Sequence, residues 1–102
     1  MDADFIRRRI TELRLKKGVS EYQMSMDMGH SRGYIQNIIS GRAMPSMAEF
    51  LYLCEYLGVT PSAFFDEGVE NPALLQKAVD EMRSLPDRDL LVLLSLIERF
   101  KE

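Results

Sequence analysis

Three side chains between positions 32 and 37 have the chemistry to recognise the edges of nucleic-acid bases. Arg32 can donate two hydrogen bonds to a guanine, and Gln36 or Asn37 can bind an adenine through one donor and one acceptor. Gly33 leaves room for close approach or for a thymine methyl group. This stretch contains no acidic residue that would repel phosphate. Its composition therefore favours base recognition over the alternative of a merely solvated polar surface.

A helix predicted over residues 31–40 must position these side chains. Ile35 and Ile38 are spaced to lie on its inner face, and Ser31 and Gly41 are placed to cap and end it. The outer face then presents the polar residues of the segment: Arg32, Gly33, Gln36, Asn37 and Ser40. Because bases are read from the start of such a helix, Arg32 and Gly33 lie at the most useful end.

A second short helix comes directly before this one. Ser20 with Gln23 three residues later forms a capping-box pattern, and the predicted helix ends at Met28. Gly29 supplies a turn where a positive φ is needed, and Ser25 is small enough for two helices to cross closely. Two short helices joined by a short turn around a glycine predict a helix-turn-helix. That pattern indicates the fold and does not by itself establish the function, because one fold can serve several functions.

The rest of the chain also shows only the helical period, so we predict an all-α fold. Capping residues, glycines and prolines divide it into five further helices. Their expected ranges are about 4–17, 46–57, 60–65, 71–85 and 87–100. The polar stretch from Asp66 to Asn71 contains Gly68 and indicates a hinge or a domain edge. The predicted domains are residues 1–67 and a helical extension, residues 68–102.

Composition narrows the class of protein. The net charge is −3 over 102 residues, but residues 1–47 carry eight basic and five acidic side chains. The N-terminal half is therefore basic, which is compatible with nucleic acid as a partner. The longest apolar run, Leu90 to Leu94, is far shorter than the roughly 18 residues of a membrane span. With no secretory signal, we expect a cytoplasmic protein. One histidine, His30, and one cysteine, Cys54, predict neither an enzyme nor a metal or cofactor site.

The segment from Ser20 to Ser46, SEYQMSMDMGHSRGYIQNIISGRAMPS, resembles the Cro/CI-type repressors, the lambda-repressor-like or XRE family. The resemblance continues through EFLYLCEYLGVTPSAFF at residues 49–65. It implies a five-helix DNA-binding domain, here followed by a two-helix extension. It also implies binding to double-stranded operator DNA, usually as a dimer, with the helix at residues 31–40 in the major groove.

The resemblance also implies contacts to the DNA backbone. The residues expected there are Glu21, Tyr22, Ser31, Tyr34, Ser40 and Arg42. Two positions depart from the family pattern. Glu21 stands where members commonly carry glutamine, and its carboxylate suits the helix dipole but repels phosphate. Arg14 lacks the glutamate with which many members pair it, because Ile39 occupies that position. Arg14 must therefore find another partner or lie in solvent.

The last predicted helix, residues 87–100, is apolar over most of its circumference. Such a helix must be buried on more than one side, so we expect the first domain and the preceding helix to cover part of it. The remainder predicts a second subunit, because large apolar patches are rare on monomers. The expected dimer contacts are Leu90, Leu93, Leu94, Ile97 and Phe100.

Two functions remain open from the sequence. The first is a dimeric transcriptional regulator, a repressor by resemblance, which the outer face of residues 31–40 favours. The second is an antitoxin-like or assembly module that keeps the fold but binds a protein, which Glu21 and the net acidity favour. Salt-sensitive binding to DNA would separate the two.

Overall fold

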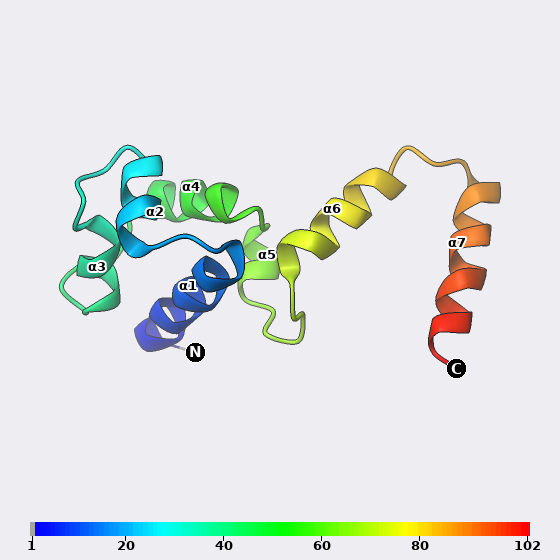
Figure 1. Ribbon diagram of the computed structural model, residues 1–102, viewed down its shortest axis with the longest axis horizontal. Helices are drawn as coiled ribbons and strands as arrows, with labels where there is room; N and C mark the ends of the chain where they lie inside the picture. Colours follow the sequence, from blue (N-terminus) through cyan, green and yellow to red (C-terminus); the bar gives the residue numbers. More distant parts are fainter. Residues whose placement is uncertain (1) are drawn as a thin grey trace.

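The computed structural model describes residues 2–102, and over this range the chain is helical without strands (Figure 1). The all-α prediction is confirmed. In chain order the helices are α1 (Ala3–Lys17), α2 (Glu21–Asp27), α3 (Tyr34–Ile39), α4 (Met47–Leu57), α5 (Pro61–Phe64), α6 (Pro72–Met82) and α7 (Asp87–Phe100).

Most helices begin where the capping residues predict. The side chains of Ser20, Ser46, Thr60 and Asn71 each accept the backbone N–H three residues further on, at 2.9 to 3.2 Å. These bonds satisfy N–H groups that have no partner inside their own helix. At the other end of α1, Gly18 adopts a φ of 81° and donates to the carbonyls of Arg14 and Leu15. Local sequence therefore sets most of the helix boundaries.

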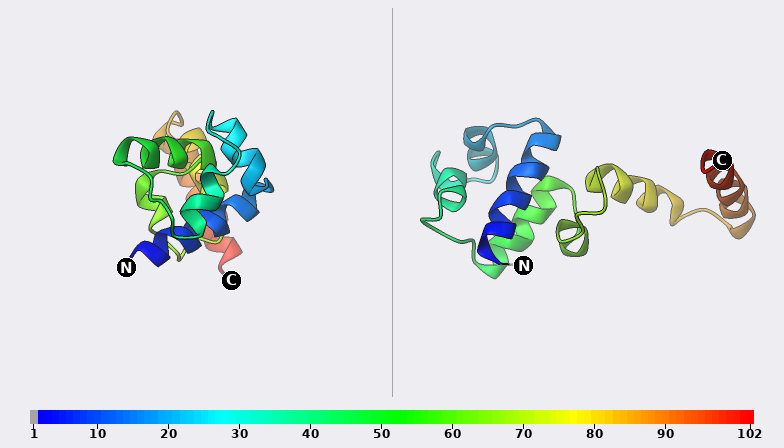
Figure 2. Two further views of the ribbon diagram at one scale, coloured as in Figure 1. Left: turned by 90° about the vertical axis from the view of Figure 1, so that its left-hand side faces the viewer. Right: turned by 90° about the horizontal axis from the view of Figure 1, so that it is seen from below.

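Helices α1 to α5 enclose one hydrophobic core, and Figure 2 shows them gathered into a single unit. Helix α3 packs against α1 and α2, and α4 packs against α1 and α5. Fully buried residues come from each of these helices, including Ile10, Met24, Ile35, Leu53 and Phe64. This shared core holds the α2–α3 unit rigidly.

Cys54 belongs to this core. Its side chain is buried among the residues that pack α4 onto the domain. Burial raises the pKa of the Cys54 thiol to about 11, so the uncharged thiol is the form present at neutral pH. The residue therefore acts as a small apolar side chain.

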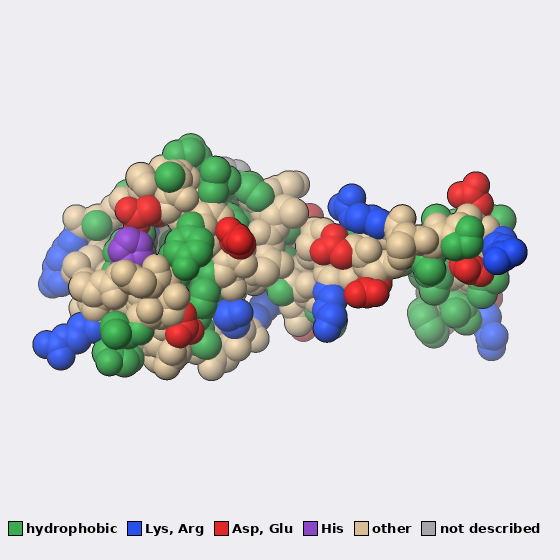
Figure 3. Space-filling view, turned by 90° about the horizontal axis from the view of Figure 1, so that it is seen from above, with side chains coloured by type: hydrophobic (Ala, Val, Ile, Leu, Met, Phe, Trp, Pro, Cys, Tyr) green, Lys and Arg blue, Asp and Glu red, His purple; other side chains and the backbone are tan. Residues whose placement is uncertain are grey.

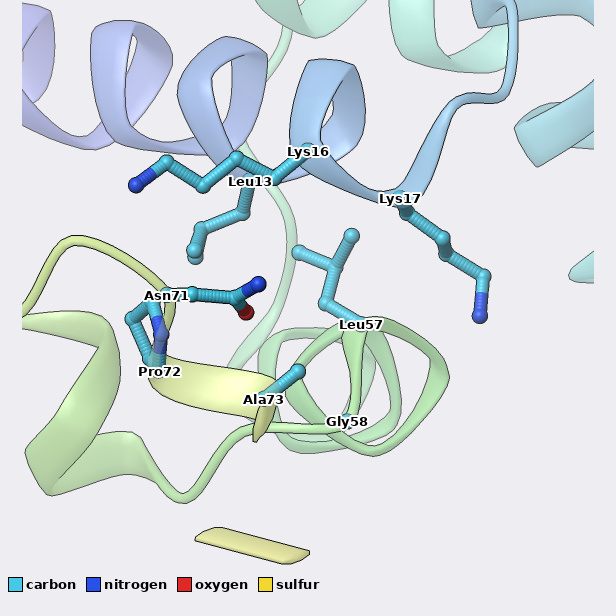
Figure 4. A pocket seen from close by; sticks show the side chains of 8 residues that line it. All are labelled: Leu13, Lys16, Lys17, Leu57, Gly58, Asn71, Pro72 and Ala73. Carbon is cyan, nitrogen blue, oxygen red and sulfur yellow. The ribbon is translucent and has the colours of Figure 1, made fainter. Parts of the chain in front are cut away.

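The first turn of α6 is fastened to the domain. Pro72 is buried, and a Cβ built on Gly58 would lie 3.4 Å from the Cβ of Ala73. Figure 4 shows Leu13 of α1 and Leu57 of α4 beside Pro72 and Ala73 of α6. The cleft between them holds about 150 Å³, below the roughly 300 Å³ of typical ligand pockets. It is a packing seam between the domain and the extension.

Helix α7 lies away from the domain, at the far end of α6 (Figure 1). None of its residues is buried, and Leu94, Ile97 and Phe100 are 56%, 40% and 80% exposed. The expectation that the domain and α6 would cover part of this helix is therefore wrong. The apolar residues Leu74 and Leu75 of α6 are exposed as well, so the two helices do not cover one another. No helix in residues 2–102 has the length and apolar character needed to cross a membrane.

Candidate nucleic-acid interface

The turn between α2 and α3 has the predicted geometry. Gly29 adopts a φ of 78°, which only glycine accepts without strain, and its N–H donates to the carbonyl of Met26 at 3.0 Å. The next N–H, of His30, donates to the carbonyl of Ser25 at 3.0 Å. These bonds end α2 and direct the chain toward α3.

Ser25 on α2 caps the start of α3. Its fully buried hydroxyl accepts the N–H of Ile35 at 3.0 Å and donates to the carbonyl of Glu21 at 2.8 Å. Ser31 was the predicted cap, and that prediction is wrong: α3 begins at Tyr34, and its flanking residue Gly33 offers no side chain. Ser31 instead belongs to a turn in which its carbonyl accepts the N–H of Tyr34. A contact between two helices supplies the cap that local sequence was expected to supply.

Ser25→Ala is expected to lower the free energy of unfolding by about 1–3 kcal/mol, because it leaves the buried N–H of Ile35 without an acceptor. Ser31→Ala removes the same group from the exposed turn and is the matched control, with an expected change within about 0.5 kcal/mol. Urea unfolding followed by circular dichroism measures both. Equal losses for the two variants would contradict this role of Ser25.

The predicted base-reading residues share one exposed surface. Arg32, Gln36 and Asn37 are exposed, while Ile35 and Ile38 are buried behind them. Arg32 and Gly33 lie in the turn that leads into α3, and Gln36 and Asn37 lie on the helix itself. Within residues 2–102, no hydrogen bond or ion pair occupies the side chains of Arg32, Gln36 and Asn37. Figure 3 shows basic side chains projecting at the end of the molecule where α3 lies.

Several of the expected backbone-contact residues surround this surface. Ser31 and Ser40 flank α3 and are exposed, and Tyr22 projects from α2 with 56% of its surface exposed. The backbone N–H of Arg42 donates to the carbonyl of Asn37 at 2.9 Å, which holds this exposed arginine at the end of α3. Glu21 is half-buried in the first turn of α2. Their contacts with DNA stay predictions.

Tyr34 has a structural role that the sequence did not indicate. Its hydroxyl donates to the carboxylate of Glu49 on α4, and its ring stacks on that of His30 with centroids 3.7 Å apart. His30 Nε2 lies 3.4 Å from the same carboxylate. Burial, reinforced by the bond to Glu49, raises the pKa of Tyr34 above its usual range. The cluster joins the start of α3 to α4, and the phosphate contact expected of Tyr34 stays a prediction.

Two of the three arginines in the run Arg7 to Arg9 serve the fold. Arg7 donates to the carbonyl of Ile38 at 3.0 Å, at the C-terminal end of α3, and pairs with Asp4. Arg9 is buried, whereas Arg8 is exposed and pairs with Glu67. All three side chains of this run are therefore bonded to groups of the protein itself. The burial of Arg9 could have been inferred from its spacing. Arg9 lies three residues after Ile6 and four before Leu13, which places it on the inner face of α1.

The buried guanidinium of Arg9 closes the C-terminal end of α5. It donates to the carbonyls of Phe64, Ala63 and Asp66 at 2.5 to 3.1 Å, and it contacts the carboxylate of Glu12 at 3.2 Å. The carbonyl of Ala63 also accepts the N–H of Asp66, whereas those of Phe64 and Asp66 accept no backbone N–H within residues 2–102, as is usual at a helix end. Arg9 thereby ties α5 to α1.

Arg14 also finds a partner inside the domain. Its Nη1 donates to the carbonyl of Val19 at 2.8 Å, in the connection between α1 and α2. Ile39, which occupies the position of the usual glutamate, is half-buried and packs against the core. The chain thus replaces an ion pair between side chains by an arginine bound to a backbone carbonyl. This bond fixes the connection that leads into α2.

The comparisons agree with this geometry. A family model described as a helix-turn-helix domain matches residues 8–68, which include α2 to α5 and most of α1. Searches of curated proteins and of solved structures found no match. The matched segment covers more than half of the chain and includes the α2–α3 unit with its exposed polar surface. The chain belongs to the helix-turn-helix domain family.

Proposed function

We propose that the protein is a sequence-specific transcriptional regulator of the Cro/CI type, acting as a repressor, that inserts α3 into the major groove of DNA. One observation carries the proposal: Arg32, Gln36 and Asn37 are exposed together on an α3 whose inner face is buried. Their hydrogen-bonding groups are not occupied by neighbouring side chains within residues 2–102. They are therefore available to a nucleic acid.

The position of each residue suits its proposed role. Arg32 precedes α3, at the end that lies deepest in the groove in helix-turn-helix complexes, and binds guanine O6 and N7. Gln36 and Asn37 follow within the helix and bind adenine N6 and N7. Gly33 brings the backbone close to the bases. Ser31, Ser40 and Arg42 hold phosphates on either side, which fixes the orientation without reading sequence.

The bonds around α3 support this role because base reading needs a rigid helix. Ser25 holds its start, Arg7 holds its end, and the bond from Tyr34 to Glu49 joins it to α4. A side chain on such a helix loses little conformational freedom when it binds. The contacts within the domain therefore favour selective binding by α3.

We further propose that α7 joins two copies of the chain. Of its apolar residues, Leu94, Ile97 and Phe100 are exposed, and Leu90 and Leu93 are only half-buried. A two-fold dimer is the commonest closed assembly and presents two copies of α3 to two half-sites. Dimerisation would thus serve both to cover α7 and to strengthen binding to an operator.

Arg32→Ala and Asn37→Ala are each expected to cost about 1–3 kcal/mol on the preferred sequence and to relax the preference at one base pair. The preferred sequence comes from selection among random duplexes, and titration at two salt concentrations measures the loss. Arg83→Ala, which removes an exposed arginine from the end of α6, is the matched control and should leave the preference unchanged. Equal losses on all sequences would show that the two residues touch only phosphate. Absence of any salt-sensitive DNA binding by the unaltered protein would contradict the proposal.

A further inference from the structure

Helix α7 carries a pattern that is symmetric about Ser95. Leu94 and Leu96 lie one residue to either side, Leu93 and Ile97 two residues, and Leu90 and Phe100 five residues. Asp89 and Lys101 lie six residues to either side and carry opposite charges. On the apolar face, an apolar residue therefore mirrors an apolar residue and an acid mirrors a base. The pairs Val92/Glu98 and Leu91/Arg99, which combine an apolar with a charged residue, lie on the other side of the helix.

These residues also share one face of the helix. Asp89 lies four residues before Leu93, and Lys101 lies four residues after Ile97, which places each charge on the same side as the apolar residues. The backbone of Lys101 continues the helical conformation, with a φ of −83° and a ψ of −10°. The apolar face thus carries a negative charge, Asp89, at its N-terminal end and a positive charge, Lys101, at its C-terminal end.

We infer that two copies of the chain pair through antiparallel α7 helices, with a two-fold axis at the level of Ser95. This inference rests on the proposed dimer and specifies its interface. The axis sets Leu90 opposite Phe100 of the second copy, Leu93 opposite Ile97, and Asp89 level with Lys101. A parallel pair would instead place Asp89 beside Asp89 and Lys101 beside Lys101, and like charges repel at an interface.

The same two charges favour a second copy of α7, rather than another apolar surface of the protein, as the partner of α7. The domain has an open apolar groove of about 350 Å³ beside the start of α4, lined in part by Met44, Met47 and Leu51. None of the residues that line this groove is charged, so it offers nothing complementary to Asp89 and Lys101. A second α7 offers both complementary charges and a matching apolar face.

A charge-reversal cycle on the full-length protein tests the pairing. D89K and K101E should each raise the dimer dissociation constant about tenfold at low salt, because each replaces two attractions by two repulsions. The double variant D89K/K101E should restore it. R99E reverses a charge at the same end of α7 but off the apolar face, and should leave it unchanged. Sedimentation equilibrium measures all four. Failure of the double variant to restore association would overturn the inference.

Cross-linking tests the orientation directly. In a mixture of D89C chains and size-tagged K101C chains, oxidation should join the two kinds of chain, while D89C chains alone should not join. The native Cys54 is buried and can stay in place. Cross-linking of D89C chains to each other would show a parallel pair and overturn the inference while leaving the proposed dimer intact. A full-length protein that is monomeric at high micromolar concentration would overturn both. Dissociation by Leu51→Glu without any effect of D89K would instead place α7 in the groove.

Discussion

Arg9→Ala is expected to lower the free energy of unfolding by about 3–5 kcal/mol, the largest loss that we predict for a single substitution in this chain. The guanidinium bonds three backbone carbonyls of the α5 segment, those of Phe64, Ala63 and Asp66. Hydrogen bonds from a charged donor are the stronger kind, and carbonyls left unpaired away from water are costly. Removal of the arginine should therefore loosen α5 from α1.

Urea unfolding measured by circular dichroism checks this value, with Arg8→Ala as the matched control. Arg8 is the neighbouring arginine, but it is exposed. It pairs with an exposed Glu67 and lies over the ring of Phe5, so its loss should cost about 1 kcal/mol or less. A chain that is too unstable to titrate after Arg9→Ala would support the prediction if Arg8→Ala unfolds normally. Equal stability of the two variants would show that water replaces the bonds of Arg9.

Replacement of Leu93 and Ile97 by glutamine is expected to convert the protein to a monomer and to weaken binding to a two-half-site operator about 100-fold. Both residues lie at the centre of the apolar face of α7, and glutamine preserves the helix while it removes the apolar contact. The dimer binds its second half-site as an intramolecular event, and the monomer loses this advantage. Light scattering measures the mass, and titration with one-half-site and two-half-site duplexes measures the affinity.

The single half-site separates this effect from damage to the DNA-binding domain, because binding to it should be unchanged. Leu91→Gln alters an exposed leucine on the other side of α7 and should leave the mass unaltered. A chain that ends at residue 85 should behave like the Leu93 and Ile97 variant, since it keeps the buried Pro72 that fastens α6. Unchanged mass after the double replacement would refute the role of α7 in dimerisation.

Much of the candidate interface could be predicted from residue types and spacing. The period of Ile35 and Ile38 placed Arg32, Gln36 and Asn37 on one exposed surface, which the structure confirms. The start of α3 and the role of Tyr34 could not be predicted. Both depend on residues distant along the chain, Ser25 and Glu49, whose position beside α3 exists only after α2 and α4 have packed.

The sequence by itself determined the all-α class, the starts of α2, α4, α5 and α6, and the Gly29 turn. Each of these depends on bonds between residues three or four apart, so their geometry follows from local order alone. The spacing of Arg9 could place it on the inner face of α1, but only tertiary structure decided its partners, which lie 54 to 57 positions away. Tertiary structure also decided that no residue of α7 is buried, because the cover of an apolar face depends on which surfaces packing brings near it, and helices α1 to α5 lie away from α7.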